Sequence, residues 1–346
     1  MDNYNYVINK SFHEVKKYYT KKDKENGFHL SIISQQFRMF SNITIVKVKA
    51  KDLNKKIVLK TVKYHHSNQA ALNKRNQASV EFNILKKIYP RFFKIPKCSV
   101  PKPILVMPEY NTYAMEFVEG NLLSNKLSSA RFFSTKRDFD QLLEYYYLSG
   151  KWLYNFQKVN GIHKSPSKQA LSSVLERANE RLNYIDKSNN KLISKDFKTK
   201  TMAFLIRKLE EIKGKQIIVS ERHSDFLPWN IIVGNNGICV IDFLGCEVDC
   251  AVVDIFKIFI SLEDEKRCLT SYSKKIDLLK QKFLLGYGDL PKLPIQALII
   301  CEAMQRIVSI WGNLNNKDKR LHHRIESFSR IKGHLNWFEQ LKKKYQ

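Results

Sequence analysis

Two carboxylates and one amide stand close together in the second half of the chain, at a spacing that suits phosphate chemistry. Asp225 precedes Asn230 by five residues, and Asp242 follows Asn230 by twelve. Phosphoryl transfer needs a group that orients the attacking hydroxyl and oxygen ligands for the Mg²⁺ on the nucleotide phosphates. Asp225 fits the first role, and Asn230 and Asp242 fit the second. The spacing therefore predicts a phosphotransfer site that uses ATP and Mg²⁺.

The residues between the amide and the second carboxylate predict a β-hairpin. Residues 231–233 and 238–241 are apolar, and the turn Gly-Asn-Asn-Gly joins them at residues 234–237. Asparagine and glycine are the residues that tight hairpin turns favour. Asn230 and Asp242 would then lie at the same end of the hairpin, where one shared metal ion requires them.

These residues also resemble a known family. His223, Asp225 and Asn230 match the His-x-Asp-x-x-x-x-Asn loop of the aminoglycoside phosphotransferase and choline kinase-like family, and Asp242 matches its Ile-Asp-Phe element. Ser224 stands where this family usually has Gly and where eukaryotic protein kinases have Arg. The resemblance implies that Asp225 and His223 are catalytic, His223 through the geometry of the loop, and that Asn230 and Asp242 bind the metal. The alternative is an ordinary buried histidine with carboxylates that cap turns.

The resemblance implies an α+β, two-lobed protein kinase-like fold, with a small antiparallel-sheet N-lobe and a mainly helical C-lobe. It covers most of residues 30–260, and the block 217–256 is its specific part. We expect a polar N-terminal extension over residues 1–27, helical around Phe12 to Tyr19. Residues 28–118 would form the ATP-binding N-lobe, and residues 119–346 the C-lobe with the catalytic loop and acceptor site.

A short polar turn in the N-lobe resembles the cap that this family places over the ATP phosphates. Ser41 and Asn42 would offer hydroxyl and backbone N–H donors to phosphate oxygens. Phe40 replaces the glycine that usually precedes the turn. An ordinary hairpin turn is the alternative.

Lys60 interrupts an apolar strand predicted over residues 57–62. Burying an ammonium group costs several kcal/mol unless it is paired, so we expect a fixed carboxylate partner. The resemblance implies that this partner is a helical glutamate, and Glu81, in the apolar-periodic segment 78–88, is the candidate. The resemblance places Lys60 against the α- and β-phosphates and pairs it with this glutamate. A lysine on an edge strand and a glutamate on a solvated helix face are the alternatives.

The segment 113–120 resembles the hinge that joins the two lobes in this family. The resemblance implies that backbone groups from Glu116 to Val118 meet the adenine edge and that Met115 lines the adenine pocket. A plain strand followed by a turn is the alternative, since many strands end in Glu-Gly.

The second lobe should be mainly helical, because residues 139–156, 166–213 and those after Pro294 repeat apolar side chains at helical spacing. The aromatic stripe of Tyr146, Trp152 and Phe156 predicts core packing rather than a ligand site. Residues 247–255 resemble the run that follows the catalytic loop in this family. Its last aspartate, Asp254, would cap a helix and brace the loop.

The chain carries a formal net charge of +27, spread along its length. A basic excess favours partners that bear negative charge, such as nucleic acid, an anionic membrane surface or an acidic substrate. No arginine-rich block or nucleic-acid-binding motif occurs, so we do not expect nucleic acid as the partner. We expect a small-molecule or glycan hydroxyl as acceptor, and the charge favours an anionic one or peripheral contact with an anionic membrane. A compositional bias of the source genome is the alternative origin of the charge.

The sequence predicts a cytoplasmic protein with reduced cysteines. No apolar signal-peptide core follows the first residues, and no stretch approaches the length of a membrane span. Cys246 and Cys250 lack a second pair at zinc spacing. The six cysteines are Cys98, Cys239, Cys246, Cys250, Cys268 and Cys301. The sequence gives no indication of oligomeric state, of ATP against GTP, or of the acceptor's identity.

The function that we predict is phosphotransfer from ATP to a hydroxyl of a small molecule, sugar or lipid-linked glycan. One alternative is a pseudokinase that binds nucleotide without turnover, although all the catalytic positions are present. The other is a protein Ser/Thr kinase, which the lack of an Ala-Pro-Glu element after Asp242 disfavours.

Overall fold

The computed structural model describes residues 2–23, 27–51, 53–63, 76–132, 135–188, 190–266, 273–288, 293–315 and 320–345. The chain divides into two compact units, one of Met1–Asn121 with Ile232–Leu244, the other of Leu122–Ile231 with Gly245–Gln346. The sequence predicts a single crossing between lobes after residue 118. The chain instead returns to the first unit for residues 232–244, because the hairpin there pairs with a strand of that unit.

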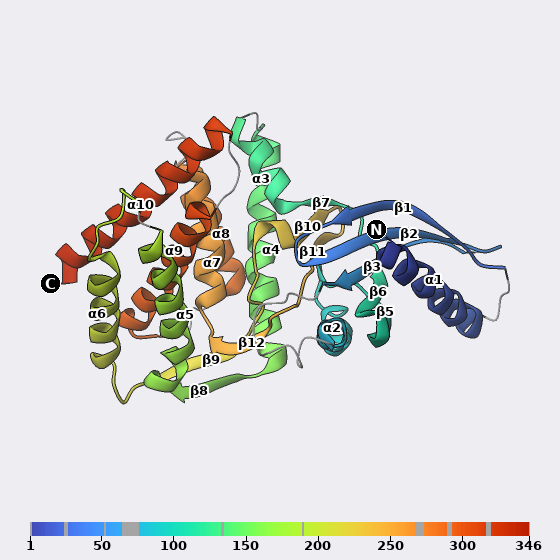
Figure 1. Cartoon of the computed structure of the whole chain (residues 1–346), viewed down its shortest axis with the longest axis horizontal. Coiled ribbons are helices and arrows are strands. Elements are labelled where there is room, and N and C mark those ends of the chain that lie inside the picture. Colours follow the sequence, from blue (N-terminus) through green and yellow to red (C-terminus); the bar gives the residue numbers. More distant parts are fainter. Residues whose placement is uncertain are drawn as a thin grey trace. The chain divides into compact units, whose positions relative to one another are not determined.

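The first unit is built on an antiparallel sheet with the strand order β1-β2-β3-β6-β5 (Figure 1). Its elements are α1 (Asp2–Asp23), β1 (His29–Phe37), β2 (Ser41–Lys49), β3 (Asn54–Val62), α2 (Gln77–Phe92), β4 (Cys98–Ser99), β5 (Pro103–Met107), the 3₁₀ helix η2 (Pro108–Tyr110), β6 (Thr112–Glu116), β7 (Asn121–Leu122), β10 (Ile231–Gly234) and β11 (Gly237–Val240).

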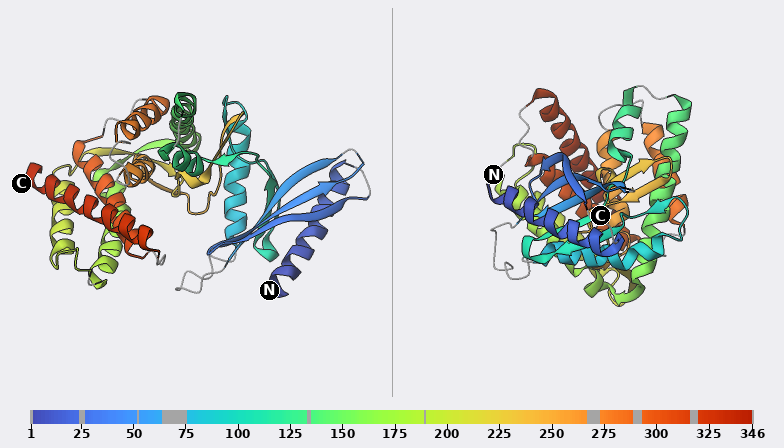
Figure 2. Two further views of the ribbon diagram at one scale, coloured as in Figure 1. Left: turned by 90° about the horizontal axis from the view of Figure 1, so that it is seen from above. Right: turned by 90° about the vertical axis from the view of Figure 1, so that its right-hand side faces the viewer.

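Strand β3 is buried because helices cover both faces of the sheet. Ile57 and Leu59 pack with α1 side chains in one hydrophobic cluster. Successive side chains of a strand point to opposite faces, so Lys60 points away from α1 and meets Glu81 of α2. Figure 2 shows α1 and α2 on either side of these strands. The buried strand predicted around Lys60 therefore lies inside a helix–sheet–helix sandwich.

Helix α1 is part of this core, whereas the sequence predicts a polar extension over residues 1–27. Ile8, Val15 and Tyr19 are each less than 5% exposed. Their spacing puts them on one face of the helix, and Tyr4 adds a hydrogen bond of 2.5 Å to Thr44 Oγ1. The described lysines of α1 face solvent. The segment is therefore polar in overall composition, although one narrow face of the helix is apolar.

The predicted hairpin of residues 231–241 is confirmed as β10 and β11. These strands belong to a second small sheet with the order β4-β11-β10-β7, in which Ile238 lies opposite Cys98. Asn230 immediately precedes β10, and Asp242 follows β11 by two residues. Gly120 lets the neighbouring backbone approach closely, because a Cβ there would lie 2.5 Å from the Val233 carbonyl oxygen.

The second unit is mainly helical, as predicted (Figure 1). Its elements are α3 (Leu123–Phe132), α4 (Lys136–Asn160), β8 (Ile162–Pro166), α5 (Ser167–Lys187), α6 (Phe197–Glu210), β9 (Gln216–Arg222), the 3₁₀ helix η3 (Pro228–Asn230), β12 (Glu247–Cys250), α7 (Val253–Lys266), α8 (Ser273–Tyr287), α9 (Ile295–Leu314) and α10 (Leu321–Tyr345). A small antiparallel sheet, β12-β9-β8, accompanies the helices.

Helices α4 and α8 cross with their backbones in contact. A Cβ on Gly150 of α4 would lie 1.9 Å from the Phe283 carbonyl oxygen, and one on Gly286 of α8 would lie 1.8 Å from the Tyr147 carbonyl oxygen. Only glycine fits at a crossing this tight. The predicted aromatic stripe of α4 is confirmed as core, because Tyr146, Trp152 and Phe156 are fully buried.

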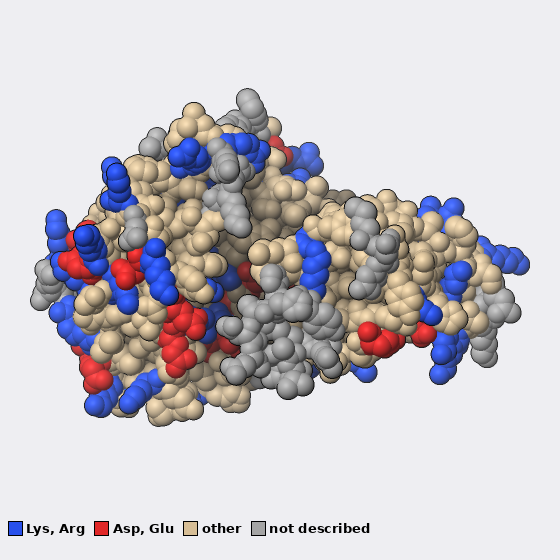
Figure 3. All heavy atoms as spheres, viewed as in Figure 1, with Lys and Arg blue, Asp and Glu red and all other residues tan. Residues whose placement is uncertain are grey.

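The described basic side chains form no single dominant patch on the face of the molecule that Figure 3 draws. On the face drawn in Figure 3, Lys and Arg side chains are scattered over each unit, with Asp and Glu among them. Within the described residues, no helix has the length and apolarity needed to span a bilayer.

The described cysteines carry free thiols. Burial raises the pKa of the Cys239 thiol to about 12, so it is protonated at neutral pH. Cys268 lies outside the described residues.

We predict that Gly150→Ala lowers the free energy of unfolding by about 1–3 kcal/mol, because the added methyl group forces α4 and α8 apart. Urea denaturation followed by circular dichroism would measure the change. Gly312→Ala in α9 is the matched control, since a Cβ there meets nothing within 4 Å. That variant should gain up to about 1 kcal/mol from helix propensity, and similar losses in both variants would contradict the tight crossing.

Candidate active site

Both carboxylate oxygens of Asp225 are held by neighbours in the second unit. Asn230 Nδ2 donates to Asp225 Oδ2 at 2.7 Å and to the Asp225 carbonyl oxygen at 2.9 Å. Lys257 Nζ lies 3.0 Å from Asp225 Oδ1. The Asp225 side chain is still 40% exposed, so an incoming hydroxyl can reach it.

The orientation of Asn230 follows from these hydrogen bonds. Its NH₂ group donates twice to Asp225, so the amide oxygen Oδ1 is the atom left to face a cation. The structure thus brings Asp225 and Asn230 together, as the sequence predicts. Carboxylate and amide oxygens are the ligands that Mg²⁺ prefers.

Lys257 is a residue of this cluster that the sequence did not reveal. It lies on the first turn of α7, three residues after Asp254, and donates to the Ser224 carbonyl oxygen as well as pairing with Asp225. The i, i+3 spacing on a helix places both side chains on the same side. The spacing of Lys257 from Asp254 is the sequence signal that could have identified Lys257, because Asp254 is already expected to brace the loop.

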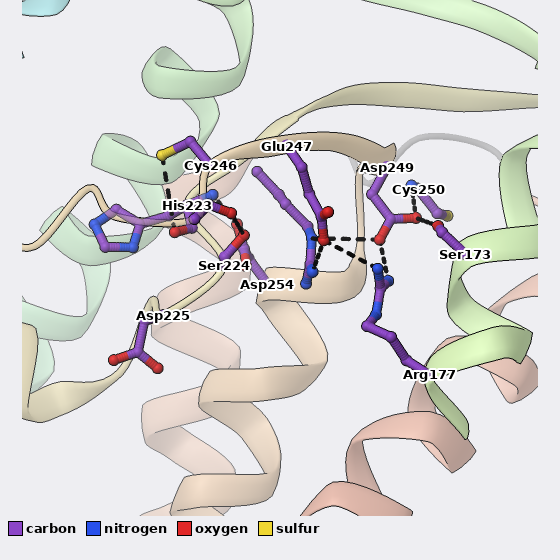
Figure 4. A network of polar contacts seen from close by, with 12 residues as sticks. Ser173, Arg177, His223, Ser224, Asp225, Cys246, Glu247, Asp249, Cys250 and Asp254 are labelled. Carbon is purple, nitrogen blue, oxygen red and sulfur yellow. Dashed lines mark hydrogen bonds and ion pairs between the residues drawn. The ribbon is translucent and has the colours of Figure 1, made fainter. Parts of the chain in front are cut away.

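The catalytic loop is anchored through its backbone. Asp254, fully buried, accepts a hydrogen bond of 2.6 Å from the His223 backbone N–H, as the sequence predicts for a bracing residue. Figure 4 shows this contact. The Ser224 hydroxyl group also donates to the carbonyl oxygen of Gly245, the residue before Cys246. Ser224 has φ of 69°, a left-handed conformation that costs most residues about 1–2 kcal/mol. This backbone explains why the family usually has glycine at this position.

His223 packs in an aromatic cage rather than facing the loop's open side. Its ring centroid lies 5.9 Å from those of Trp152 and Phe226 and 6.1 Å from that of Phe156. The side chain is fully buried. The ring thus packs in the core of the second unit, and a role of His223 in setting the loop geometry stays a prediction.

An ion-pair network holds the strand that follows the loop (Figure 4). Arg177 and Arg222 both pair with Glu247 and with Asp249, which is 2% exposed. Ser173 adds a hydrogen bond to Asp249. These contacts tie α5, β9 and β12 together, so that the chain enters α7 and its loop-bracing residues at a fixed point.

The first unit contains the buried ion cluster that the sequence predicts around Lys60. Lys60 Nζ lies 2.8 Å from Glu81 Oε1 and 2.6 Å from Asp242 Oδ1. Burial alone lowers the pKa of Lys60, but the two carboxylates raise it above its ordinary value, so the ammonium stays charged. Glu81 Oε1 also accepts the Phe243 backbone N–H at 3.0 Å. One buried glutamate thus fixes both the lysine and the Asp-Phe element.

Asp242 has an unusual backbone. Its φ is 71°, and its side chain is 36% exposed while paired with Lys60. Strained non-glycine residues of this kind concentrate at functional sites.

The structure places the predicted phosphate turn at the beginning of a strand. Ser41 and Asn42 are the first residues of β2, opposite Val62 and Thr61, and each is less than 10% exposed. The chain reversal itself falls at residues 38–40, closed by a hydrogen bond from Arg38 N–H to the Ser41 carbonyl oxygen. Any phosphate contact from Ser41 or Asn42 would therefore come from the strand end rather than the turn.

The predicted hinge residues lie where β6 ends. Met115 is buried, and Glu116 closes the strand. The Glu116 and Phe117 backbone N–H groups donate to the carbonyl oxygens of Lys102 and Lys56. A backbone N–H donor for an adenine ring would therefore have to come from beyond them, at Val118.

Solved structures share this fold. A search of protein family models finds no match, and a search of curated proteins finds none either. The chain is similar to a glucosamine kinase in complex with glucosamine, ADP and inorganic phosphate, with a TM-score of 0.55 and 12% identity over 90% of this chain and 94% of the other. It is also similar to an amicoumacin kinase in complex with AMP-PNP and Ca²⁺, with a TM-score of 0.55 and 10% identity over 93% and 95% of the chains.

A choline kinase from Cryptosporidium parvum Iowa II is similar as well, with a TM-score of 0.52 and 15% identity over 91% of this chain and 90% of the other. At these identities the likeness establishes the fold. The predicted α+β, protein kinase-like fold of the small-molecule phosphotransferases is confirmed.

We predict that Glu81→Leu lowers the free energy of unfolding by about 3 kcal/mol, because it leaves a buried ammonium short of one carboxylate. The double variant Lys60→Met/Glu81→Leu should recover most of that loss, since no unpaired charge then stays buried. Urea titration of the single and double variants would measure both changes.

The control is the exposed pair Lys56–Glu119, whose side chains are 45% and 78% exposed. Glu119→Gln should change stability by no more than about 0.5 kcal/mol. A double variant less stable than Glu81→Leu would contradict the pairing argument.

Proposed function

We propose that this protein transfers the γ-phosphate of ATP to a hydroxyl group of a small molecule. The observation that carries the proposal is the buried Lys60 ammonium, held by Glu81 and Asp242 within a fold shared with small-molecule kinases. A buried ion cluster is a poor source of stability. It is, however, the arrangement that positions nucleotide phosphates in kinases.

The proposed roles follow from the charge of each group. Lys60 would hold the α- and β-phosphates, and Asp225 would orient the acceptor hydroxyl. Asn230 through its amide oxygen and Asp242 through its carboxylate would be ligands of Mg²⁺, which neutralises charge on the phosphates when bound. If it bound the metal, Asp242 would give up part of its ion pair with Lys60. Positioning and electrostatics supply most of the catalysis in this chemistry.

The nucleotide would be ATP, in keeping with the ADP and AMP-PNP named for the similar structures. We propose that Ser41 and Asn42 contact its phosphates from the start of β2. Met115, Glu116 and Val118, at the end of β6, would contact the adenine. Peripheral contact with an anionic membrane and a cytoplasmic location remain predictions from composition.

We predict that Asp225→Ala and Asp242→Asn each reduce phosphate transfer by about 10³-fold or more. The two variants should differ in nucleotide binding, because only Asp242 would contact the metal. Calorimetric titration with ATP should show Mg²⁺-dependent binding for Asp225→Ala, and that dependence should be lost for Asp242→Asn.

The activity test is transfer from labelled ATP with Mg²⁺ into a soluble and membrane extract, with Asp225→Ala as the inactive control. A labelled small molecule or glycolipid formed only by the wild type is the expected result. Unchanged turnover in Asp242→Asn would remove the assignment. Nucleotide binding without any labelled product would favour a pseudokinase, and labelled protein would favour a protein kinase.

A further inference from the structure

A pocket of about 430 Å³ opens beside the catalytic loop, within the second unit. Leu227 and Trp229 of the loop form one wall, and Lys257 links the pocket to Asp225, 3.0 Å away. Helices α7, α9 and α10 supply the remaining walls. A molecule bound here would lie next to the carboxylate to which we assign the acceptor hydroxyl.

We propose that this pocket binds an uncharged, polyhydroxylated acceptor of the sugar class and disfavours acceptors that carry an ammonium or a carboxylate. The proposal rests on the proposed phosphotransferase function and names its acceptor class. Three features of the pocket lead to it: its balanced charge, the protein partners that its ionised groups already have, and its exposed indole.

The charges that line the pocket cancel. Lys257 and Arg330 contribute two positive charges, and Asp264 and Glu265 contribute two negative charges, which sum to zero. An ammonium group binds favourably where carboxylates are in excess, and an anion where cations are in excess. The pocket offers neither excess, although the whole chain carries +27. The overall charge that favours an anionic acceptor is therefore not the charge of the pocket lining.

The acidic groups are also occupied by protein donors. Asp264 Oδ1 lies 2.9 Å from His334 Nε2, and Asp264 Oδ2 accepts the Ser309 hydroxyl at 2.7 Å. Arg306 NH1 lies 3.3 Å from His334 Nδ1, and a guanidinium can only donate, so Nδ1 accepts and the histidine proton sits on Nε2. Burial alone raises the pKa of Asp264, but the His334 and Ser309 hydrogen bonds lower it overall, so it is ionised and satisfied. Glu265 pairs with Arg330 at 3.8 Å.

The ammonium group of the pocket that lies beside the loop is also bound by protein groups. Lys257 pairs with Asp225 and donates to the Ser224 carbonyl oxygen. A carboxylate on the acceptor would have to compete with Asp225 for this ammonium. It would also meet the carboxylates of Asp264 and Glu265, which line the same pocket.

The neutral surfaces of the pocket suit a sugar. Trp229 is 49% exposed, and a half-exposed indole offers an apolar face on which the C–H face of a pyranose can stack. Gln305 and Asn313 bring amide groups into the lining, and each amide both donates and accepts hydrogen bonds, as hydroxyl groups do. Small-molecule sites usually combine such an apolar platform with a few convergent polar groups.

The test compares neutral sugars with analogues in which one hydroxyl-bearing group is replaced by an ammonium or a carboxylate. Hexoses (glucose, galactose and mannose), their 2-amino analogues and their uronic acids would be assayed with labelled ATP and the full-length protein. We expect kcat/KM for at least one neutral hexose to exceed that of its amino and uronic analogues by about tenfold or more. A preference for either charged analogue, or transfer to no sugar at all, would overturn the proposal.

A charge-changing variant separates the pocket from the rest of the surface. Arg330→Gln leaves the pocket with a net charge of −1, and the ratio of kcat/KM for the amino sugar to that for the hexose should rise about tenfold. Lys213→Gln makes the same change in overall charge at an exposed pair, 75% and 58% exposed, and should leave the ratio unchanged. Equal ratios in both variants would overturn the assignment of the acceptor to this pocket.

A binding measurement keeps this inference distinct from the proposed function. Trp229→Ala should raise KM for the neutral hexose by about tenfold with little change in kcat, as loss of a stacking contact requires. ATP hydrolysis in the absence of acceptor should occur in the wild type and should be lost in Asp242→Asn. If the wild type shows no ATP hydrolysis, that result counts against the proposed phosphotransferase function. If the wild type hydrolyses ATP but shows no preference among the sugars, that result counts only against the proposed acceptor class.

Discussion

The buried ammonium of Lys60 is the constraint around which the first unit is organised. It can stay charged inside the sheet only because Glu81 and Asp242 lie within hydrogen-bonding distance. That requirement fixes the position of α2, which carries Glu81, and the position of the backbone at Phe243, which Glu81 also binds. With α1 covering the opposite face, β3 has no access to solvent along its second half. The contacts of this one buried ammonium group and its glutamate partner thus hold β3, α2 and the end of the 231–241 hairpin together.

The second unit handles its charges differently. Asp225 is partly exposed and keeps its place through two donors, Asn230 and Lys257. The loop backbone is fixed by a buried carboxylate, Asp254, and by the aromatic packing of His223. Rigid support beneath an accessible carboxylate is what orientation of a hydroxyl requires. Leu227 and Trp229 of the same loop form a wall of the neighbouring pocket. The segment that holds Asp225 in place therefore also shapes the pocket.

The sequence predicted those parts of the structure in which a local pattern has one physical solution. A lysine in an apolar strand needs a carboxylate, which identified Glu81, and Gly-Asn-Asn-Gly between apolar runs identified the hairpin. It failed for α1, where an apolar stripe is diluted by lysines. It also missed Lys257, although its i, i+3 spacing from Asp254 was a signal, and it missed the pocket, because the walls come from helices far apart in the chain and no local pattern records their proximity. Ser41 and Asn42 were assigned to a turn, whereas the register of β2 with β3 places them in a strand.

The glycine crossing of α4 and α8 also bears on how this sequence can change. Gly150 sits two residues before Trp152, and Trp152 stacks on Phe226 of the catalytic loop at a centroid distance of 5.6 Å. A larger residue at 150 or 286 would displace the helix that carries this indole, and the displacement would reach the loop through the stacked rings. The two glycines and the aromatic cage therefore form one packing unit, through which a substitution at the helix crossing would disturb the loop that carries Asp225.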